Sequence, residues 1–590
     1  MKTINHPWIN LDDIRLWLHT CDAEHGHKCR AADTWTAVAW LIDVHNQCLI
    51  PCDPNINYQY VALSYVWGQC PSSQTTMANL EAFQIPGAFS EKNQDVTIPK
   101  TIRHAIKLVG LLNIPYLWVD RFCICQDDAE SIHLQLRRMG HIYENAYLTL
   151  IAANGTDANH GLHGIEGVTK ERICSYYLAP YLEGLSCRAS PWYARGWTFQ
   201  ELFFSHRKLK FQSDVVLWEC DCAVWLETTG VTRRVPHVPG GYTSGSLGEP
   251  WGGLDLEPIR ITPWKSNVET QKLLRTEHPM ERYRKMVCEY NNRQLTYAED
   301  RMRAFAGVTT KMEADFPSGF IWGLPVANFE AALLWQSDRY GGGMKRRVQR
   351  HPDSTQFPTW SWVGWTGGIR GSHWDYQRLD IRIVSSEDVV PAISVDDAKT
   401  VQRLIIPACV WYCTTLSGIL PIVSDFLLAS RPELGEARGK LQDVLHQDTI
   451  HPFLRTRTKV VVCTVKPFYS STAEVYYIDR NVFFPRIGYL FLPGDHSRAQ
   501  WWQVCELMVL SKSLTRRSYD TFGCGQLLPD HYSTEPFKRE KGNFTYNQRQ
   551  AYNVLWITRR DGIAYRKAFG MISVDAIDSL PGEMMDIVLG

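Results

Sequence analysis

The sequence carries no excess charge and no long apolar run. Its 62 Lys and Arg residues balance 62 Asp and Glu residues, so no net field attracts nucleic acid or an anionic membrane over long range. The richest apolar runs fall short of the roughly 20 residues that cross a bilayer, and the opening residues lack the apolar core of a secretory signal. We expect a cytoplasmic protein with no membrane span and no nucleic-acid partner.

Two nucleotide-binding signatures are also missing. No GxxxxGK[ST] segment occurs, and no GxGxxG follows a strand-like segment, so a Gly-rich phosphate loop and NTP hydrolysis are not favoured. The 17 cysteines are an odd number scattered over a long chain, unlike the dense framework of a small secreted module. We expect mostly free thiols in a reducing compartment and no resident cofactor.

The chain has ample material for more than one core. Its 590 residues are 45% hydrophobic, and single cores stop growing well below this length. A Gly/Pro/Ser-rich stretch lies between about 230 and 258, and mainly short strands follow position 372, ending in a predicted hairpin that turns at Asp561-Gly562. We predict an N-terminal extension (1–55), an α/β domain (56–225), a linker and helical region (226–372) and a β-rich region (373–590).

Strand and helix signals alternate in the α/β domain. Apolar strands are predicted at 60–66, 116–120 and 147–153, and this order is typical of a parallel sheet covered by helices. Pro99 stands at the start of the first helix, and Asp127 with Glu130 is expected to cap the second. Residues 190–205 are predicted as one further helix that leads into a strand.

Polar and aromatic side chains follow the predicted strands. Ligands of an open parallel sheet bind beyond the carboxyl ends of its strands, so these residues are candidates for one site. They are Ser64, Tyr65, Trp67 and Gly68 after the first strand, Asp120, Arg121, Gln126 and Asp127 after the second, Asn154 after the third, and Arg195, Trp197, Gln200 and Glu201 on the last helix.

Three segments of this domain together resemble a known family. In order and spacing, YVALSYVWG, YLWVDRFCICQDD and RGWTFQELFFSHRKLKF are similar to the signature segments of the fungal heterokaryon incompatibility (HET) domain. The family's second segment reads close to WIDALCINQ, and here Arg121 and Cys125 depart from it. The resemblance implies a parallel-sheet, TIR-like or flavodoxin-like α/β fold. It also implies a part in fungal non-self recognition, in which the domain triggers growth arrest or programmed cell death.

The distant likeness of HET domains to TIR domains implies a specific chemistry. Trp197 precedes Glu201 by four residues, as a Trp precedes the catalytic Glu of NAD-cleaving TIR domains. By this resemblance Glu201 is the catalytic candidate and NAD is a substrate, not a cofactor. A carboxylate stabilises the oxocarbenium-like ribosyl cation. The substrate-binding candidates are Ser64, Tyr65, Trp67, Gly68, Asp120, Gln126, Arg195 and Trp197.

Structural roles for the same residues stay open at this stage. Trp197 could belong to the core, Glu201 could pair with Arg195, and Asp120 could cap its loop. Whether the domain is an NAD glycohydrolase is therefore undecided. The alternative is a non-enzymatic signalling module that works by self-association or with another incompatibility protein, and a metabolic or developmental role is a third hypothesis.

A cluster of metal-ligand residue types lies near the N-terminus. Cys21, His25, His27 and Cys29 form a C-x3-H-x-H-x-C pattern with zinc-compatible donors, which Cys48 or Cys52 could complete. The spacing is not that of a standard zinc finger. The competing interpretation is a loop with ordinary thiols and exposed imidazoles.

Overall fold

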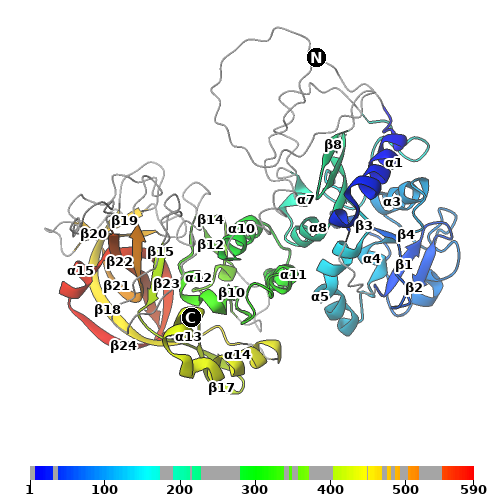
Figure 1. The fold of residues 1–590 in the computed structure, drawn as a ribbon. Helices are drawn as coiled ribbons and strands as arrows, with labels where there is room; N and C mark the ends of the chain where they lie inside the picture. The colour runs from blue at the N-terminus through cyan, green and yellow to red at the C-terminus, as the bar shows by residue number, and fades with distance from the viewer. Residues whose placement is uncertain are drawn as a thin grey trace, which may run out of the picture. The chain divides into compact units, whose positions relative to one another are not determined.

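The computed structural model divides into two compact units (Figure 1). One comprises residues 1–276, 293–295 and 303–308, and the other comprises 277–292, 296–302 and 309–590. The predicted linker at 230–258 lies outside the described residues. These are 7–30, 38–172, 190–212, 215–226, 279–337, 344–347, 356–370, 403–447, 450–467, 475–479, 486–491, 503–516 and 548–590.

An eight-stranded sheet organises the first unit, with the order β2-β1-β4-β3-β5-β6-β7-β8. Its four central strands, β4, β3, β5 and β6, run parallel, and two antiparallel strands flank them on each side. The strands are β1 (Trp40–Asp43), β2 (Cys48–Pro51), β3 (Tyr60–Ser64), β4 (Tyr116–Trp118), β5 (Leu148–Ala152), β6 (Arg207–Gln212), β7 (Val215–Cys220) and β8 (Val224–Leu226). The predicted parallel sheet is confirmed for the four central strands, whereas the whole sheet is mixed, because the antiparallel strands β1, β2, β7 and β8 extend it.

Helices cover both faces of this sheet (Figure 1). Helix α3 (Lys100–Leu111) packs against β3 and β4, while α5 (Ala129–Asn145) and α8 (Thr198–Phe204) pack against one another. Every residue of β3 and β5 is buried, as expected for parallel strands that are covered on both sides. Two one-turn helices, α2 (Leu80–Phe83) and α4 (Asp120–Cys123), lie in the connections.

The strand order creates a switch point beside Ser64. From β3 the chain crosses by α3 to β4 on one side, and then by α5 to β5 on the other side of β3. Ser64, the last residue of β3, pairs in register with Ile151 of β5. Ligands of such sheets bind in the crevice at this point.

Two local predictions were wrong. Asp128, not Asp127, caps α5, because its carboxylate accepts the N–H groups of Glu130 and Ser131, whereas Asp127 accepts the N–H of Met77. The segment 190–205 forms two helices, α7 (Pro191–Ala194) and α8, instead of one. Trp197 immediately precedes the first residue of α8.

The N-terminal segment is helical and changes pitch along its length. Helix α1 (Leu11–Thr20) begins at the capping side chain of Asn10 and continues as a π-helix, η1 (Cys21–His25), and a 3-10 turn, η2 (Gly26–Cys29). Gly26 adopts φ +50 and ψ −127, a conformation that favours glycine. The turn at Gly26 redirects the chain between His25 and Cys29.

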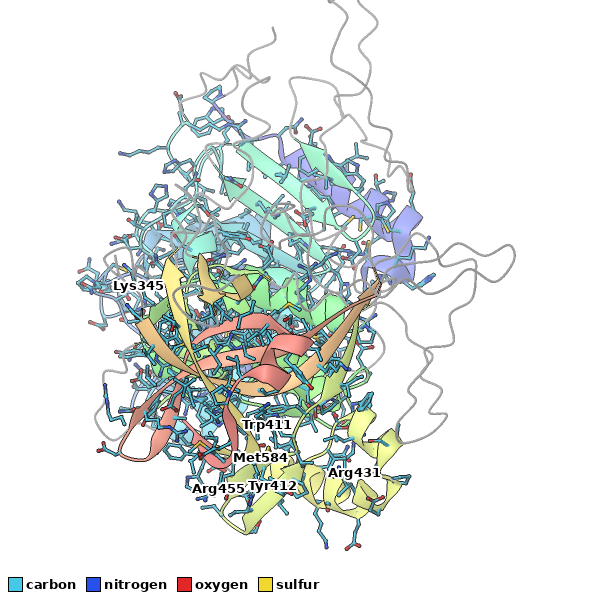
Figure 2. The ribbon with its side chains drawn as sticks, turned by 90° about the vertical axis from the view of Figure 1, so that its left-hand side faces the viewer. Lys345, Trp411, Tyr412, Arg431, Arg455 and Met584 are labelled. Carbon is cyan, nitrogen blue, oxygen red and sulfur yellow. The ribbon has the colours of Figure 1, made fainter. Side chains whose placement is uncertain are left out.

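The second unit is built on a ten-stranded, mainly antiparallel sheet, which confirms the β-rich C-terminal region. Strand β16 alternates, with Trp411 buried and the neighbouring Tyr412 exposed (Figure 2). The predicted hairpin joins β22 to β23 through Asp561 and Gly562, both at positive φ. The strands are β15 (Arg403–Pro407), β16 (Trp411–Thr415), β17 (Gly418–Ile422), β18 (Leu454–Pro467), β19 (Val475–Asp479), β20 (Arg486–Phe491), β21 (Gln503–Arg516), β22 (Gln548–Arg560), β23 (Ile563–Ser573) and β24 (Gly582–Leu589).

The remaining helices and short strands belong to the second unit, except that residues 303–308, at the start of one helix, belong to the first. None of the helices in the described ranges is both long and apolar enough to span a bilayer. The helices are α10 (Pro279–Asn291), α11 (Arg303–Lys311), α12 (Phe329–Ala332), α13 (Asp425–Ser430), α14 (Gly435–Gln447) and α15 (Val574–Ser579). The short strands are β9 (Phe320–Ile321), β10 (Leu324–Pro325), β11 (Gln336–Ser337), β12 (Lys345–Arg346), β13 (Trp365–Thr366) and β14 (Ile369–Arg370).

Candidate functional site

Ser64 and Glu201 meet beneath the switch point of the sheet. The Ser64 hydroxyl donates a hydrogen bond to the Glu201 carboxylate, and it accepts one from the indole Nε1 of Trp192 at 2.6 Å. Ser64 and Trp192 are fully buried, and Glu201 is 6% exposed. The chain therefore holds one carboxylate in a fixed orientation at the carboxyl end of β3.

The surroundings of Glu201 shift its protonation. Burial raises the pKa of Glu201 from its ordinary value of 4.5 to about 7, and the negative charge of Asp120 adds to this. The hydrogen bond from Ser64, the charge of Arg195 and the hydroxyl of Tyr143 act in the opposite direction. Glu201 thus changes charge close to neutral pH.

A second polar group forms around Asp120 at the end of β4. The indole Nε1 of Trp67 donates to Asp120 Oδ2 at 2.6 Å, and the backbone N–H of Arg121 donates to Oδ1 at 2.8 Å. Burial raises the pKa of the Asp120 carboxyl. The Arg121 guanidinium lies over the Trp67 ring, 4.2 Å from its centroid, so one face of this indole is covered and a planar ligand could stack only on the other.

Arg195 and Tyr65 complete the surroundings of the two carboxylates. Arg195 Nη1 donates to the backbone carbonyl of Tyr65 at 3.0 Å, and its charge acts on both Glu201 and Asp120. Tyr65 is buried, and burial raises its pKa well above the ordinary value. At neutral pH Tyr65 is therefore a neutral phenol.

Gly68 and Gln126 have structural contacts. Gly68 has φ +61, and a Cβ there would overlap the side chain of Asp157, so only glycine allows this approach. The Gln126 amide donates to the carbonyls of Asp120 and Ile124, each at 3.0 Å. Both residues shape the loops that carry Trp67 and Asp120.

Trp192, and not Trp197, is the tryptophan in contact with the Ser64–Glu201 pair. Trp197 is half-buried, and its side chain makes no hydrogen bond or ring contact with any residue in the described ranges, whereas its backbone carbonyl accepts from the N–H of Gln200 at 3.1 Å. Trp192 was missed because its relation to Ser64 spans 128 positions and depends on the break between α7 and α8. Tyr143, which donates to the Leu63 carbonyl from α5 at 3.1 Å, was missed because the two residues lie 80 positions apart.

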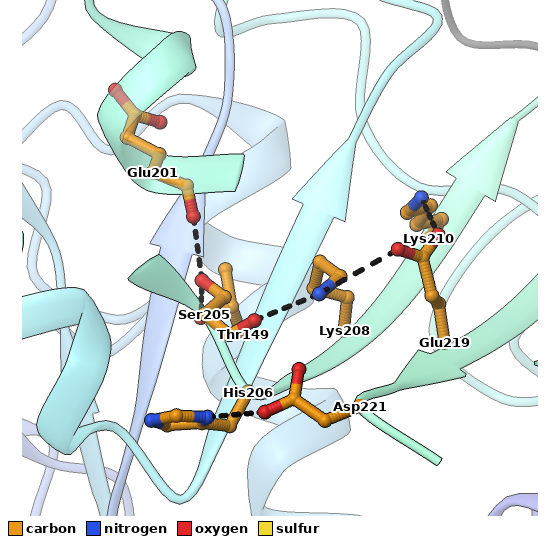
Figure 3. A network of polar contacts seen from close by, with 8 residues as sticks. All are labelled: Thr149, Glu201, Ser205, His206, Lys208, Lys210, Glu219 and Asp221. Atoms are coloured by element: carbon orange, nitrogen blue, oxygen red, sulfur yellow. Dashed lines mark hydrogen bonds and ion pairs between the residues drawn. The ribbon is translucent and has the colours of Figure 1, made fainter. Parts of the chain in front are cut away.

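Buried hydrogen bonds fix the C-terminal end of α8 (Figure 3). The Ser205 hydroxyl donates to the Glu201 carbonyl at 2.5 Å and contacts Thr149 of β5 at 2.7 Å. Lys208 Nζ donates to the Ser205 carbonyl at 2.7 Å and lies 3.6 Å from Glu219, which also pairs with Lys210. These contacts tie the backbone of Glu201 to β5, β6 and β7.

Burial differs among the candidate residues of the site. Ser64, Glu201 and Trp192 are buried, whereas Trp67, Asp120, Arg195 and Trp197 are half-buried. A neighbouring pocket at the carboxyl ends of β5 and β6 is lined in part by Asn154, His160 and Gln212, and Glu201 does not line it. Of the predicted residues, Asn154 therefore belongs to this pocket.

The N-terminal cysteines gather differently from the predicted pattern. Cys21, His25 and Cys29 come together with Cys220, the last residue of β7. His27 is exposed and lies outside the group, and Cys48 and Cys52 do not complete it. The fourth member escaped the sequence pattern because it lies 191 positions beyond Cys29.

Comparison with known families identifies the region that carries the site. Residues 60–201 match the family model described as heterokaryon incompatibility protein (HET), so the chain contains a HET domain that runs from β3 to Glu201. No curated protein and no solved structure matches the chain at a significant level.

Proposed function

We propose that this HET domain acts in fungal heterokaryon incompatibility and triggers growth arrest or cell death by hydrolysing NAD, with Glu201 as its catalytic residue. The supporting observation is the buried Ser64–Glu201 hydrogen bond at the switch point, with Asp120, Trp67 and Arg195 around it. The central strand order also supports the TIR-like part of the proposal, because it is the flavodoxin-like order 2-1-3-4.

Hydrolysis of NAD requires mainly a negative charge positioned near the ribose. The bond between the ribose C1′ and the nicotinamide nitrogen breaks, and its electron pair leaves with nicotinamide, which becomes neutral. Water adds to C1′ and releases a proton, so the products are ADP-ribose, nicotinamide and H⁺. The Glu201 carboxylate stabilises the ribosyl cation between these events. Arg195 would pair with a phosphate, and Trp67 would stack on a base through the ring face opposite Arg121.

Turnover of NAD by the purified full-length chain tests the enzymatic proposal. Glu201→Gln keeps the size of the side chain and removes its charge, so we expect NAD cleavage to fall at least about 100-fold. Wild-type turnover should rise with pH through about 7, as the carboxyl loses its proton.

Glu330→Gln is the matched control. Glu330 lies in the second unit and is also buried, and burial likewise raises its pKa to about 7. The control should cleave NAD at the wild-type rate. Equal turnover by wild type and Glu201→Gln would refute the role of Glu201.

One observation favours a non-enzymatic module. Glu201 is nearly inaccessible, and Ser64 already satisfies part of its hydrogen bonding, as expected of a structural carboxyl. Leu134 on α5 is 46% exposed and could serve self-association. In that case toxicity in an expression host persists in Glu201→Gln and is lost in Leu134→Glu, whereas the enzymatic proposal predicts the reverse.

A further inference from the structure

We propose that Cys21, His25, Cys29 and Cys220 form a structural zinc site that fastens the N-terminal helical segment to strand β7. The four candidate donor atoms, three Sγ and one imidazole nitrogen, all lie within 4.8 Å of one another. Cys220 Sγ is 3.4 Å from His25 Nδ1. In a tetrahedral zinc site the sulfur–nitrogen and sulfur–sulfur edges are about 3.6 and 3.8 Å, so the preformed group requires only small adjustments.

Local backbone geometry brings three of the donors together. Cys21 begins the π-helix η1, His25 ends it, and Cys29 ends the 3-10 turn η2. Gly26 joins these turns at positive φ. The cysteines are buried and the imidazole is half-buried, which suits a closed structural site better than a catalytic site with an open position.

Contacts around the donors hold them in place. The His25 ring stacks on Trp225 of β8, with centroids 5.8 Å apart and an interplanar angle of 23°. The carboxylate of Asp22, beside Cys21, accepts from Arg207 at 2.7 Å, from Tyr147 at 2.6 Å and from Arg30 at 3.0 Å. Asp22 is thus occupied by donors and orients η1, as outer contacts do at metal sites.

The charged residues around the four donors are also compatible with bound zinc. Zinc with three thiolates and a neutral imidazole carries one negative charge, and Asp22 carries another. Arg207, which is almost fully buried, and Arg30 supply two positive charges at the same place. A set of three sulfurs and one nitrogen is typical of zinc and disfavours hard cations such as Mg²⁺ and Ca²⁺.

Metal analysis of the full-length chain tests the site. Protein expressed with added zinc and purified without chelators should contain about one zinc per chain by mass spectrometry of the metal. Cys21→Ser and Cys220→Ser should lose most of it. Cys222→Ser, two residues further along the same hairpin, and His27→Ala should retain it as matched controls, because neither residue belongs to the group.

If a serine variant does not fold, replacement of zinc by cobalt in the wild-type protein provides a second test. Cobalt-loaded wild type should show the intense visible bands of a tetrahedral thiolate site. His25→Cys should bind cobalt with a shifted charge-transfer band, because it replaces the nitrogen donor by a fourth sulfur. Wild type with less than about 0.2 zinc per chain, or with a disulfide among Cys21, Cys29 and Cys220, would overturn the proposal, as would zinc content unaffected by Cys220→Ser. None of these outcomes depends on NAD cleavage.

Discussion

The two large sheets of the chain bury their residues in different patterns. In the first unit every residue of β3, β5, β6 and β7 is buried. In the second unit β16 alternates between buried positions and exposed or half-buried ones, and the first half of β23 alternates between buried and half-buried positions. The first pattern belongs to strands covered on both faces, and the second to strands with one face towards solvent.

This difference explains where a functional site can form. Covered parallel strands present side chains to a ligand only where they end, and their carboxyl ends share one edge. Ser64 and Asp120 lie at that edge, and Glu201 reaches it from α8. Most strands of the second sheet are antiparallel to their neighbours. The carboxyl ends of neighbouring antiparallel strands lie at opposite edges of the sheet, so they do not share one edge.

The largest expected effect comes from the charges that the first sheet buries. Glu219→Gln removes the carboxylate that faces the buried ammonium groups of Lys208 and Lys210, and we expect a loss of about 3–5 kcal/mol in the free energy of unfolding. The matched change in the second sheet is Glu506→Gln, whose pair with Arg559 is partly exposed, and it should cost at most about 1 kcal/mol. Denaturant titration of both variants measures this, and equal costs would contradict the contrast between the sheets.

The pH dependence of stability, compared between wild type and Glu201→Gln, tests the burial of Glu201 in the first unit. The folded state raises the pKa of Glu201 from 4.5 to about 7, so it favours the protonated form. The stability that this supplies is complete below pH 4.5 and is lost as the pH rises through 7. Relative to Glu201→Gln, wild type should lose about 3 kcal/mol of unfolding free energy between pH 4.5 and 8. A difference that does not change with pH in urea titrations would show that Glu201 is not buried as described.

The central strands of the first sheet and the residues at their carboxyl ends could be predicted from the sequence. The strands β3, β4 and β5 lie where compact apolar segments end in Ser64, Asp120 and the loop before Asn154. The hairpin at Asp561-Gly562 was equally visible, because its turn needs residues that tolerate positive φ. These features depend on neighbours in the sequence, and their signals are therefore local.

The features that could not be predicted from the sequence depend on contacts between segments that are distant along the chain. The helix predicted over 190–205 is broken because the N–H of Gly196 donates to the carbonyl of Gln294, and the N–H of Gln294 donates to that of Ala194, each at 2.6 Å. This break lets Trp192 reach Ser64. Cys220 joins Cys21 and Cys29 only through the fold of β7. Residue spacing within one segment cannot predict contacts of this kind.

The smallest expected effect compares two fully buried tryptophans. Trp192 donates to Ser64 at 2.6 Å, whereas the buried Nε1 of Trp411 in the second sheet finds no hydrogen-bond partner among the residues that the structure describes. Replacing each by Phe removes similar volume, but only Trp192→Phe also removes a hydrogen bond, which is worth about 1 kcal/mol. We expect Trp192→Phe to be the more destabilising variant by that amount in thermal unfolding. It should also reduce NAD cleavage, because Ser64 loses the donor that orients it toward Glu201, whereas Trp411→Phe should leave cleavage unchanged. The opposite ranking would mean that Ser64 is held by the sheet alone, and that the indole fills space beside the site without positioning it.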